Sequence, residues 1–179
     1  MTPEAYLDRV RALLPVLRER APNAEKLRRL PEETFDDFQE SGLFRCIQPK
    51  RYEGYELDPE TFYQAIIEVS AVCGSSGWIL GVVGVHNWHM ALFPPQAQEE
   101  VWGEDTSIQI STSLAPTGTV ERVDGGFASA AVGRSPAAAT TVIGRRWALS
   151  YRQSKPARRP TRGSSLYRAA IMRSTTTGT

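Results

Sequence analysis

Acidic residues are confined to the first part of this sequence. All twenty Asp and Glu residues lie within residues 1–127 with eleven of the Lys and Arg residues, whereas residues 128–179 carry the other ten basic residues and no acidic one. Globular domains normally intersperse both signs of charge. We therefore expect residues 1–127 to fold, and residues 128–179 to form an off-pattern basic tail that is disordered.

The bulk composition is that of a globular protein without an electrostatic partner. The 179-residue chain is 41% apolar and has a formal net charge of +1, which excludes a field strong enough to hold nucleic acid or an anionic membrane. Cys46 and Cys73 lack CxxC spacing, the N-terminus has no signal-peptide pattern, and the longest mostly apolar run, residues 78–93, is too short to span a membrane. We expect a cytoplasmic protein with free thiols.

Helical spacing of apolar residues covers most of the first hundred positions. It predicts helices over residues 3–20, 23–29, 31–42, 58–72, 78–93 and 95–101. Asn23 is a candidate cap for the second of these, and Asp58-Pro59-Glu60 supplies an N-cap, a first-turn proline and an early acid for the fourth. Residues 73–77 predict a break, and Gly81 and Gly84 predict a close approach by another backbone.

The pattern becomes strand-like after Gly103. Residues 108–114 alternate in the manner of a strand, a second strand is expected to end at Val123, and Asp124-Gly125-Gly126 is a strong hairpin signal. The sequence thus predicts a helical domain over residues 1–104, followed by the beginning of a β domain over residues 105–127.

The tail has several possible origins. A basic tail can contact nucleic acid or a membrane, or it can be a solvated appendix. Codons read one base out of frame, however, permit the string RLSGRWAFSSGSDHCDWA directly after Phe127 and LPRSDYEIDDNW from about Leu166. The first string would continue the β domain with alternating apolar residues and turn glycines. We favour a single-base deletion just after the Phe127 codon.

Four segments resemble one enzyme family. They are RERAPNAEKLRRLPEETFDDFQESGLFRCIQP at residues 18–49, SAVCGSSGW at 70–78, VGVHNWHMALFPPQAQEEVWGED at 83–105 and ISTSLAP at 110–116. The chain resembles the oxygenase component of two-component flavin-dependent aromatic monooxygenases, the type that hydroxylates 4-hydroxyphenylacetate and seco-steroid phenols. The resemblance covers nearly all of residues 10–127. It implies an α+β chain with the acyl-CoA dehydrogenase-like N-terminal helical domain and without the C-terminal helical bundle.

This resemblance implies a monooxygenase that uses reduced FMN or FAD and O2 to hydroxylate a phenol or an indole-like ring in aromatic catabolism. A separate NAD(P)H-flavin reductase would be its partner, and the full-length form would be a homotetramer. Two alternatives stay open: an acyl-CoA dehydrogenase relative, and a non-catalytic truncated helical module. The 179-residue chain itself is expected to be poorly soluble and inactive alone, because exposed strand edges and apolar helix faces favour aggregation.

The resemblance also implies which residues contact the flavin. Trp78 corresponds to a family position near the flavin, and Thr112, Ser113 and Leu114 correspond to the strand beside the isoalloxazine edge, where backbone and hydroxyl groups can bind ring atoms. From the residues alone, Trp78 is a core tryptophan and the other three are an ordinary strand.

His86 is the candidate catalytic residue. A buried histidine near a phenol can bind the ring hydroxyl and favour the phenolate, which activates the ring toward an electrophilic oxygen. The alternative is a core histidine with a satisfied hydrogen bond, and His89 could face the substrate instead. A metal site is not expected, because the HNWH spacing is not that of a zinc helix and no carboxylate is adjacent. Cys73 is expected to be a packed core thiol.

Overall fold

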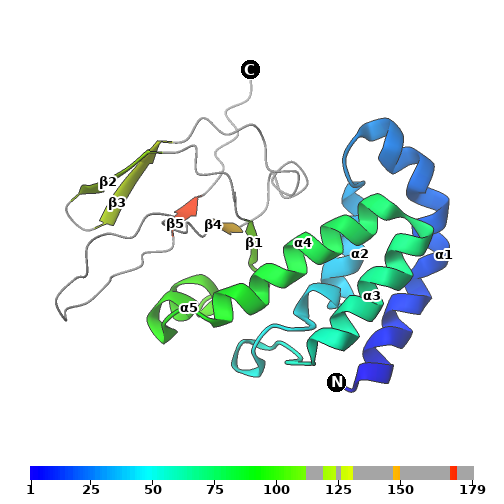
Figure 1. Cartoon of the computed structure of the whole chain (residues 1–179), viewed down its shortest axis with the longest axis horizontal. Coiled ribbons are helices and arrows are strands. Elements are labelled where there is room, and N and C mark those ends of the chain that lie inside the picture. The colour runs from blue at the N-terminus through cyan, green and yellow to red at the C-terminus, as the bar shows by residue number, and fades with distance from the viewer. Residues whose placement is uncertain (112–118, 124–125, 131–146, 150–169, 173–179) are drawn as a thin grey trace.

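The computed structural model describes residues 1–111, 119–123, 126–130, 147–149 and 170–172, with side chains for residues 1–110. Helices α1 to α5 account for most of the described residues and precede the strands along the chain (Figure 1). This order confirms the α+β class, with a helical region first and strands after it.

Helix α1 (Pro3–Leu27) begins where Thr2 accepts a hydrogen bond from the Ala5 amide at 3.2 Å. The sequence predicted a helix that ended near residue 20 and a new one capped by Asn23; this division is wrong, because α1 continues through Pro22. Ala24 is buried on the same face as the earlier apolar residues, so packing extends the helix across a proline that would otherwise break it. The helix ends at Arg28, which adopts the left-handed conformation.

Helix α2 (Glu32–Glu40) follows Pro31 and stops before Gly42, as the sequence predicts. Gly42 has a φ of 74°, a conformation that favours glycine, and from it the chain enters the short 3-10 helix η1 (Leu43–Arg45). A second 3-10 turn, η2 (Lys50–Tyr52), leads toward the third long helix.

Helix α3 (Pro59–Val72) has the bounds that its sequence signals predict. The carboxylate of Asp58 accepts a hydrogen bond from the Thr61 amide at 2.9 Å, and Pro59 occupies the first turn. The predicted break after α3 is shorter than expected. Only Cys73 leaves the helical conformation, and the Gly-Ser-Ser-Gly run forms the first turn of α4 (Gly74–Ala91).

The glycines of α4 meet α3 in a way that the sequence did not predict. A Cβ atom at Gly84 would lie 2.7 Å from the Phe62 ring, and one at Gly81 would lie 3.3 Å from Ile66 Cδ1, so side chains of α3 fill these spaces rather than a backbone. The close backbone approach occurs at Gly77 instead, where a Cβ atom would lie 2.8 Å from Ser70 Cα. The three glycines allow α3 and α4 to pack closely.

Gly84→Ala is expected to lower the free energy of unfolding by about 1–3 kcal/mol, because the added methyl group collides with the buried Phe62 ring. Gly74→Ala in the same helix is the control, since nothing lies within 4 Å of its added Cβ atom. Urea denaturation of both variants measures the difference. Equal midpoints for Gly84→Ala and Gly74→Ala would contradict this account of the α3–α4 contact.

The main core lies where α1, α3 and α4 pack against η1, and its larger side chains are aromatic. Phe44 packs against Phe35 and Phe38 with ring centroids 5.1 and 5.7 Å apart. A second apolar cluster lies at the far end of α4, around α5 (Pro95–Trp102). Its buried members are Tyr52, Met90, Ala97, Val101, Trp102, Ile108 and Ile110.

The short strand β1 (Gln109–Ser111) leaves this second cluster. It pairs in parallel with β4 (Trp147–Leu149), which pairs antiparallel with β5 (Ala170–Met172). Strands β4 and β5, and residues 128–130 at the end of the next strand pair, lie in the range predicted to be disordered. The rest of that prediction concerns residues outside the described part. The predicted hairpin is confirmed: β2 (Thr119–Val123) pairs antiparallel with β3 (Gly126–Ala130), with Val123 opposite Gly126.

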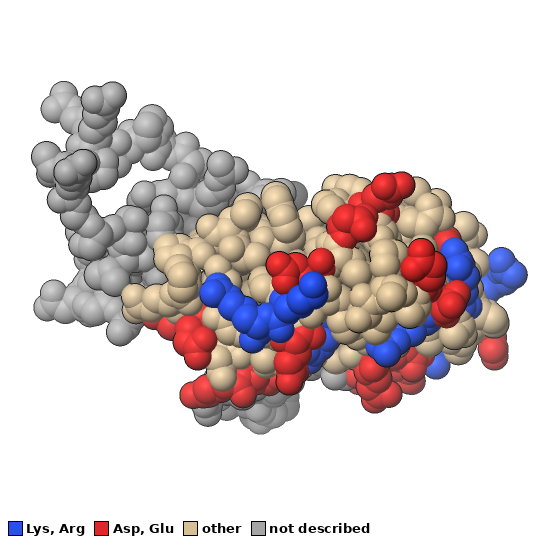
Figure 2. Space-filling model, turned by 90° about the horizontal axis from the view of Figure 1, so that it is seen from below, with Lys and Arg blue, Asp and Glu red and all other residues tan. Residues whose placement is uncertain are grey.

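Charged side chains of both signs share the surface. Figure 2 shows Lys and Arg beside Asp and Glu across one face, and the ion pairs Arg11–Glu68 and Arg20–Asp37 are examples at 2.9 and 2.6 Å. Among the residues that the structure describes, no helix is long and apolar enough to cross a membrane.

Candidate functional site

His86 lies on the inner side of α4 and is 8% exposed. Its Nδ1 is hydrogen-bonded to the carbonyl oxygen of Val82, one turn earlier in the helix. Because a carbonyl can only accept, Nδ1 must carry the proton, and in the neutral ring Nε2 is then the nitrogen that accepts. The helix therefore selects the tautomer of His86.

Burial lowers the pKa of His86 from its ordinary value of 6.5. The hydrogen bond to the Val82 carbonyl opposes this shift, and the nearby His89 adds a smaller lowering effect. The imidazole is consequently neutral at physiological pH. A neutral ring can accept a proton or a hydrogen bond from a weak acid such as a phenol, whereas an imidazolium cannot.

The stability of the chain should depend on pH through His86. Between the lowered pKa of the folded state and the value of about 6.5 in the unfolded state, the unfolded chain binds more protons, so the free energy of unfolding rises with pH in that window. Stability is then fully present above that window and lost as pH falls through it. Thermal melts at several pH values measure this, and His86→Gln should weaken the dependence; an unchanged dependence in His86→Gln would contradict it.

His89 lies beside His86 but in a different setting. The two ring centroids are 6.3 Å apart, and the His89 ring packs edge-on against Phe93 at 5.7 Å. His89 is half-buried, so His86 is the more enclosed of the pair. No group of three or more His, Cys, Asp and Glu side chains suited to a metal ion occurs in the part of the chain searched, which is the described residues.

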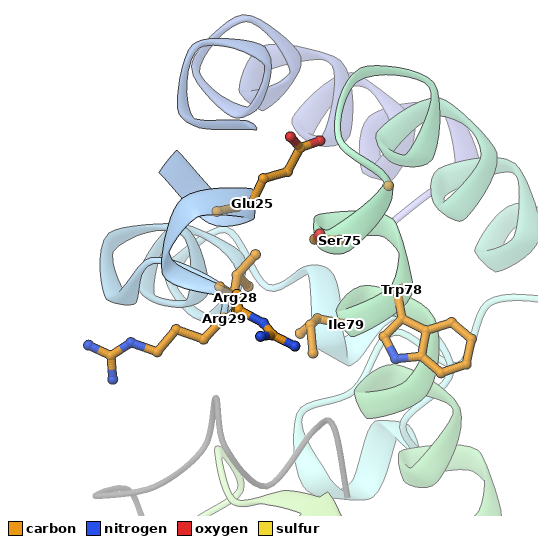
Figure 3. Close-up of a pocket in the computed structure, with 9 residues that line it drawn as sticks. Glu25, Arg28, Arg29, Ser75, Trp78 and Ile79 are labelled. Atoms are coloured by element: carbon orange, nitrogen blue, oxygen red, sulfur yellow. The ribbon is translucent and has the colours of Figure 1, made fainter. Parts of the chain in front are cut away.

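Trp78 occupies the surface. Its side chain is 61% exposed, so the interpretation as a core tryptophan is wrong. It borders an open pocket of about 560 Å³ at the N-terminal end of α4. Arg28 and Arg29 reach this pocket from the end of α1, whereas Trp78 and Ile79 reach it from α4 (Figure 3). The lining thus combines an exposed indole and two arginines with the acidic Glu25, and Figure 3 shows the indole and one of the guanidinium groups pointing to opposite sides.

The structure does not bring Trp78 and His86 into contact. They lie eight residues apart on α4, about 12 Å along an axis that rises 1.5 Å per residue. The other predicted flavin contacts, Thr112, Ser113 and Leu114, lie outside the described residues. They follow β1 in the sequence, and β1 packs against the His86-bearing helix through Gln109.

Sequence reasoning missed two buried polar residues, one in α4 and one in β1. Asn87 is completely buried, and its amide nitrogen donates to the carbonyl oxygen of Phe44 at 2.7 Å. Gln109 is 4% exposed, although its place between Ile108 and Ile110 predicts a solvent-facing position. The signal in the sequence was an amide side chain within a mostly apolar run, residues 78–93.

Cys73 is buried, as predicted for a core thiol, and its sulfur accepts a hydrogen bond from the Ser76 hydroxyl at 3.1 Å. Cys46 is also a buried free cysteine, and burial raises its pKa to about 12. A thiol with so high a pKa stays protonated, so Cys46 is a poor nucleophile.

The chain belongs to the acyl-CoA dehydrogenase family. Residues 3–106 match the family model described as the acyl-CoA dehydrogenase N-terminal domain, which covers the helical region and ends just before β1. The predicted fold family is thereby confirmed.

Within that family, the chain is similar to flavin-dependent monooxygenases. It is 51% identical over 121 residues to the oxygenase subunit HsaA of a flavin-dependent monooxygenase from Rhodococcus jostii, which covers 68% of this chain and 32% of the relative. It is 36% identical to the oxygenase component of p-hydroxyphenylacetate 3-hydroxylase from Acinetobacter baumannii, over 69% of this chain and 29% of the relative.

One solved structure is similar to this chain over a larger share of its length. XiaF from Streptomyces in complex with FADH2 and glycerol matches 82% of this chain and 37% of its own, with a TM-score of 0.69 and 25% identity. The chain spans about a third of the length of the curated relatives it matches. The resemblance predicted from four sequence segments is confirmed at the level of the family.

Proposed function

We propose that this chain is part of an aromatic-ring hydroxylase that uses reduced flavin and O2. The similarity to monooxygenase oxygenase components carries the proposal, and the enclosed neutral imidazole of His86 is compatible with it. The substrate class is an electron-rich ring, a phenol or an indole-like compound, because such rings react with an electrophilic oxygen without further activation by a metal.

His86 is the proposed catalytic residue. With its proton on Nδ1, the Nε2 atom can accept a hydrogen bond from the ring hydroxyl and increase the negative charge on that oxygen. The burial that lowers its pKa keeps it in the accepting form at neutral pH. Val83 and Met90, about one turn before and after His86 on α4, are buried apolar residues.

Reduced flavin supplies the oxygen-transfer chemistry when bound. Trp78 is proposed to pack near the ring, and Thr112, Ser113 and Leu114 to bind its edge. The exposed indole of Trp78 and the arginines of the same pocket, which Glu25 also lines, are compatible with FMN or FAD. We further propose a separate NAD(P)H-flavin reductase as the partner, a homotetramer for the full-length form and a cytoplasmic location.

Residues 128–179 are proposed to arise from a shifted reading frame after the Phe127 codon. The change in charge composition at this point and the family-like string in the neighbouring frame support this proposal. Sequencing the gene across that codon tests it directly. A neighbouring frame without a coherent continuation would contradict it.

The activity is tested by supplying the protein with a flavin reductase, NADH and ¹⁸O2 in the presence of a phenol, an indole or an acyl-CoA. Mass spectrometry then detects whether one oxygen atom enters the ring. Ring hydroxylation with one labelled atom supports the proposal. Oxidation of the acyl-CoA without label in any ring product would instead identify an acyl-CoA dehydrogenase. Both the 179-residue chain and the product of a frame-restored gene are assayed.

A further inference from the structure

Three amide side chains link α2, β1 and α4: the half-buried Gln39 and the buried Gln109 and Asn87. Gln109 donates from Nε2 to Gln39 Oε1 at 3.1 Å and to the Ser107 carbonyl at 3.0 Å. Its Oε1 faces the Asn87 amide nitrogen at 3.5 Å, a long hydrogen bond. Asn87 donates in turn to the Phe44 carbonyl in η1 at 2.7 Å. We call Gln39, Gln109 and Asn87 the amide relay.

The hydrogen bonds determine how each amide of the relay is oriented. The Asn87 nitrogen lies against a backbone carbonyl, so a flipped amide would place its oxygen against an acceptor. Gln109 likewise presents its nitrogen to the Ser107 carbonyl, which leaves its oxygen toward Asn87. Each of these two amides can therefore form its hydrogen bonds in one orientation only. The strand that carries Gln109 is held in a single orientation as a result.

The relay also selects the register of β1. Ile108 and Ile110 pack in the apolar cluster around Trp102, whereas Gln109, between them, contacts Gln39 and Asn87. Successive strand residues point to opposite faces, so a slip of one residue would place the amide in the apolar cluster and an isoleucine among the amides. Both faces of the strand therefore oppose a slip.

The buried amide of Asn87 is unfavourable for the stability of the fold, so its presence needs another explanation. In the described part of the chain, its Oδ1 is buried without a hydrogen-bond partner. An unsatisfied buried acceptor is unfavourable, and an apolar side chain of similar volume avoids that loss. The amide at position 87, next to His86, is therefore better explained by the position that it imposes on β1.

We infer that the amide relay is a positioning device: Asn87 and Gln109 hold β1 in one register against the helix that carries His86. The inference rests on the proposed function only for the role of His86. Residues 112–114 continue from β1, so the relay determines where the proposed flavin-binding strand starts relative to the imidazole. Asn87 and Gln109 are positioning residues and do not themselves contact reacting atoms.

The test uses the ¹⁵N-labelled 179-residue chain and follows the imidazole resonances of His86 by NMR across its titration. The variants are Asn87→Ala, Gln109→Ala and the isosteric Gln109→Glu, which keeps an acceptor for Asn87 but loses the donor to Gln39 and to the Ser107 carbonyl. Gln98→Ala is the matched control, because Gln98 is also a buried glutamine bonded to two backbone carbonyls, of Ala91 and Phe93, but none of its hydrogen bonds reaches β1. Melting temperatures are recorded for every variant.

All the alanine variants should melt at lower temperature than the wild type. Only Asn87→Ala, Gln109→Ala and Gln109→Glu should also shift the His86 resonances and increase hydrogen exchange at the Ile110 amide. Gln109→Glu is included because a carboxylate cannot donate to the Ser107 carbonyl or to Gln39 Oε1. Equal shifts in Gln98→Ala, or unchanged His86 resonances in Gln109→Ala, would overturn the inference. If Asn87→Ala does not fold, Gln109→Ala and Gln109→Glu decide.

The test is separate from that of the proposed function, because neither readout requires turnover. Coupling between Gln109 and His86 in a protein that hydroxylates nothing would support the relay and refute only the hydroxylase. Hydroxylation by a protein in which Gln109→Ala leaves His86 unchanged would refute only the relay.

Discussion

Restoring one base after the Phe127 codon is expected to produce a protein that hydroxylates phenols with a turnover in the usual enzymatic range, about 1–10³ s⁻¹, whereas the 179-residue chain produces none. The described helices supply His86 and the proposed contact Trp78, but Trp78 and Trp88 are 61% and 47% exposed. A reactive oxygen donor needs a site from which water is excluded. In the 179-residue chain the Trp78 ring is open to solvent, although the His86 ring is enclosed.

The measurement is product formation with a flavin reductase, NADH and O2, monitored by liquid chromatography and mass spectrometry. Reactions without the oxygenase are the control, because free reduced flavin and the peroxide that it forms can oxidise phenols slowly. Robust turnover by the purified 179-residue chain, or none by the frame-restored protein with any aromatic tested, would contradict the prediction in opposite ways.

Trp102→Ala is expected to lower the free energy of unfolding by about 3–5 kcal/mol, which is enough to unfold a marginal domain. The Trp102 side chain is completely buried, packs against Tyr52 at a centroid distance of 5.2 Å and donates from Nε1 to the Ile108 carbonyl at 3.2 Å. Its removal leaves a cavity in the second apolar cluster and an unpaired carbonyl at the start of β1. Chemical denaturation followed by circular dichroism measures the loss.

Trp102→Phe separates the two contributions, because it keeps an aromatic ring but removes the hydrogen bond. It should therefore be less destabilised than Trp102→Ala. The exposed Trp88 provides the control, since Trp88→Ala removes a side chain of the same type from the surface of α4. If Trp102→Ala and Trp88→Ala unfolded at the same denaturant concentration, the second cluster would not have the role given to it here.

Local signals predicted those elements whose ends are controlled by nearby residues. The bounds of α3 follow from Asp58 and Pro59, and the β2–β3 hairpin follows from Asp124-Gly125-Gly126. Each signal acts within about four residues, so it does not depend on the rest of the fold. The family resemblance was also visible, because its segments remain continuous in the sequence.

Two local expectations failed where distant packing opposed them. The apolar spacing up to residue 20 and the Asn23 cap predicted that α1 would be divided, but the buried face through Ala24 continues it to Leu27. The Gly-Ser-Ser-Gly run predicted a long break, but the contact of Gly77 with Ser70 places that run in the first turn of α4. In both cases burial against another helix outweighed a weak local preference.

The sequence by itself determined the α+β order of this protein, its family and the choice of His86 as the candidate catalytic residue. Only the tertiary structure decided that the His86 ring is enclosed, that the Trp78 ring is exposed, and that Asn87 and Gln109 meet between α4 and β1. The reason is physical. Helix periodicity and turn chemistry act over a few residues, whereas burial and the pairing of amides 22 positions apart depend on how separate elements pack.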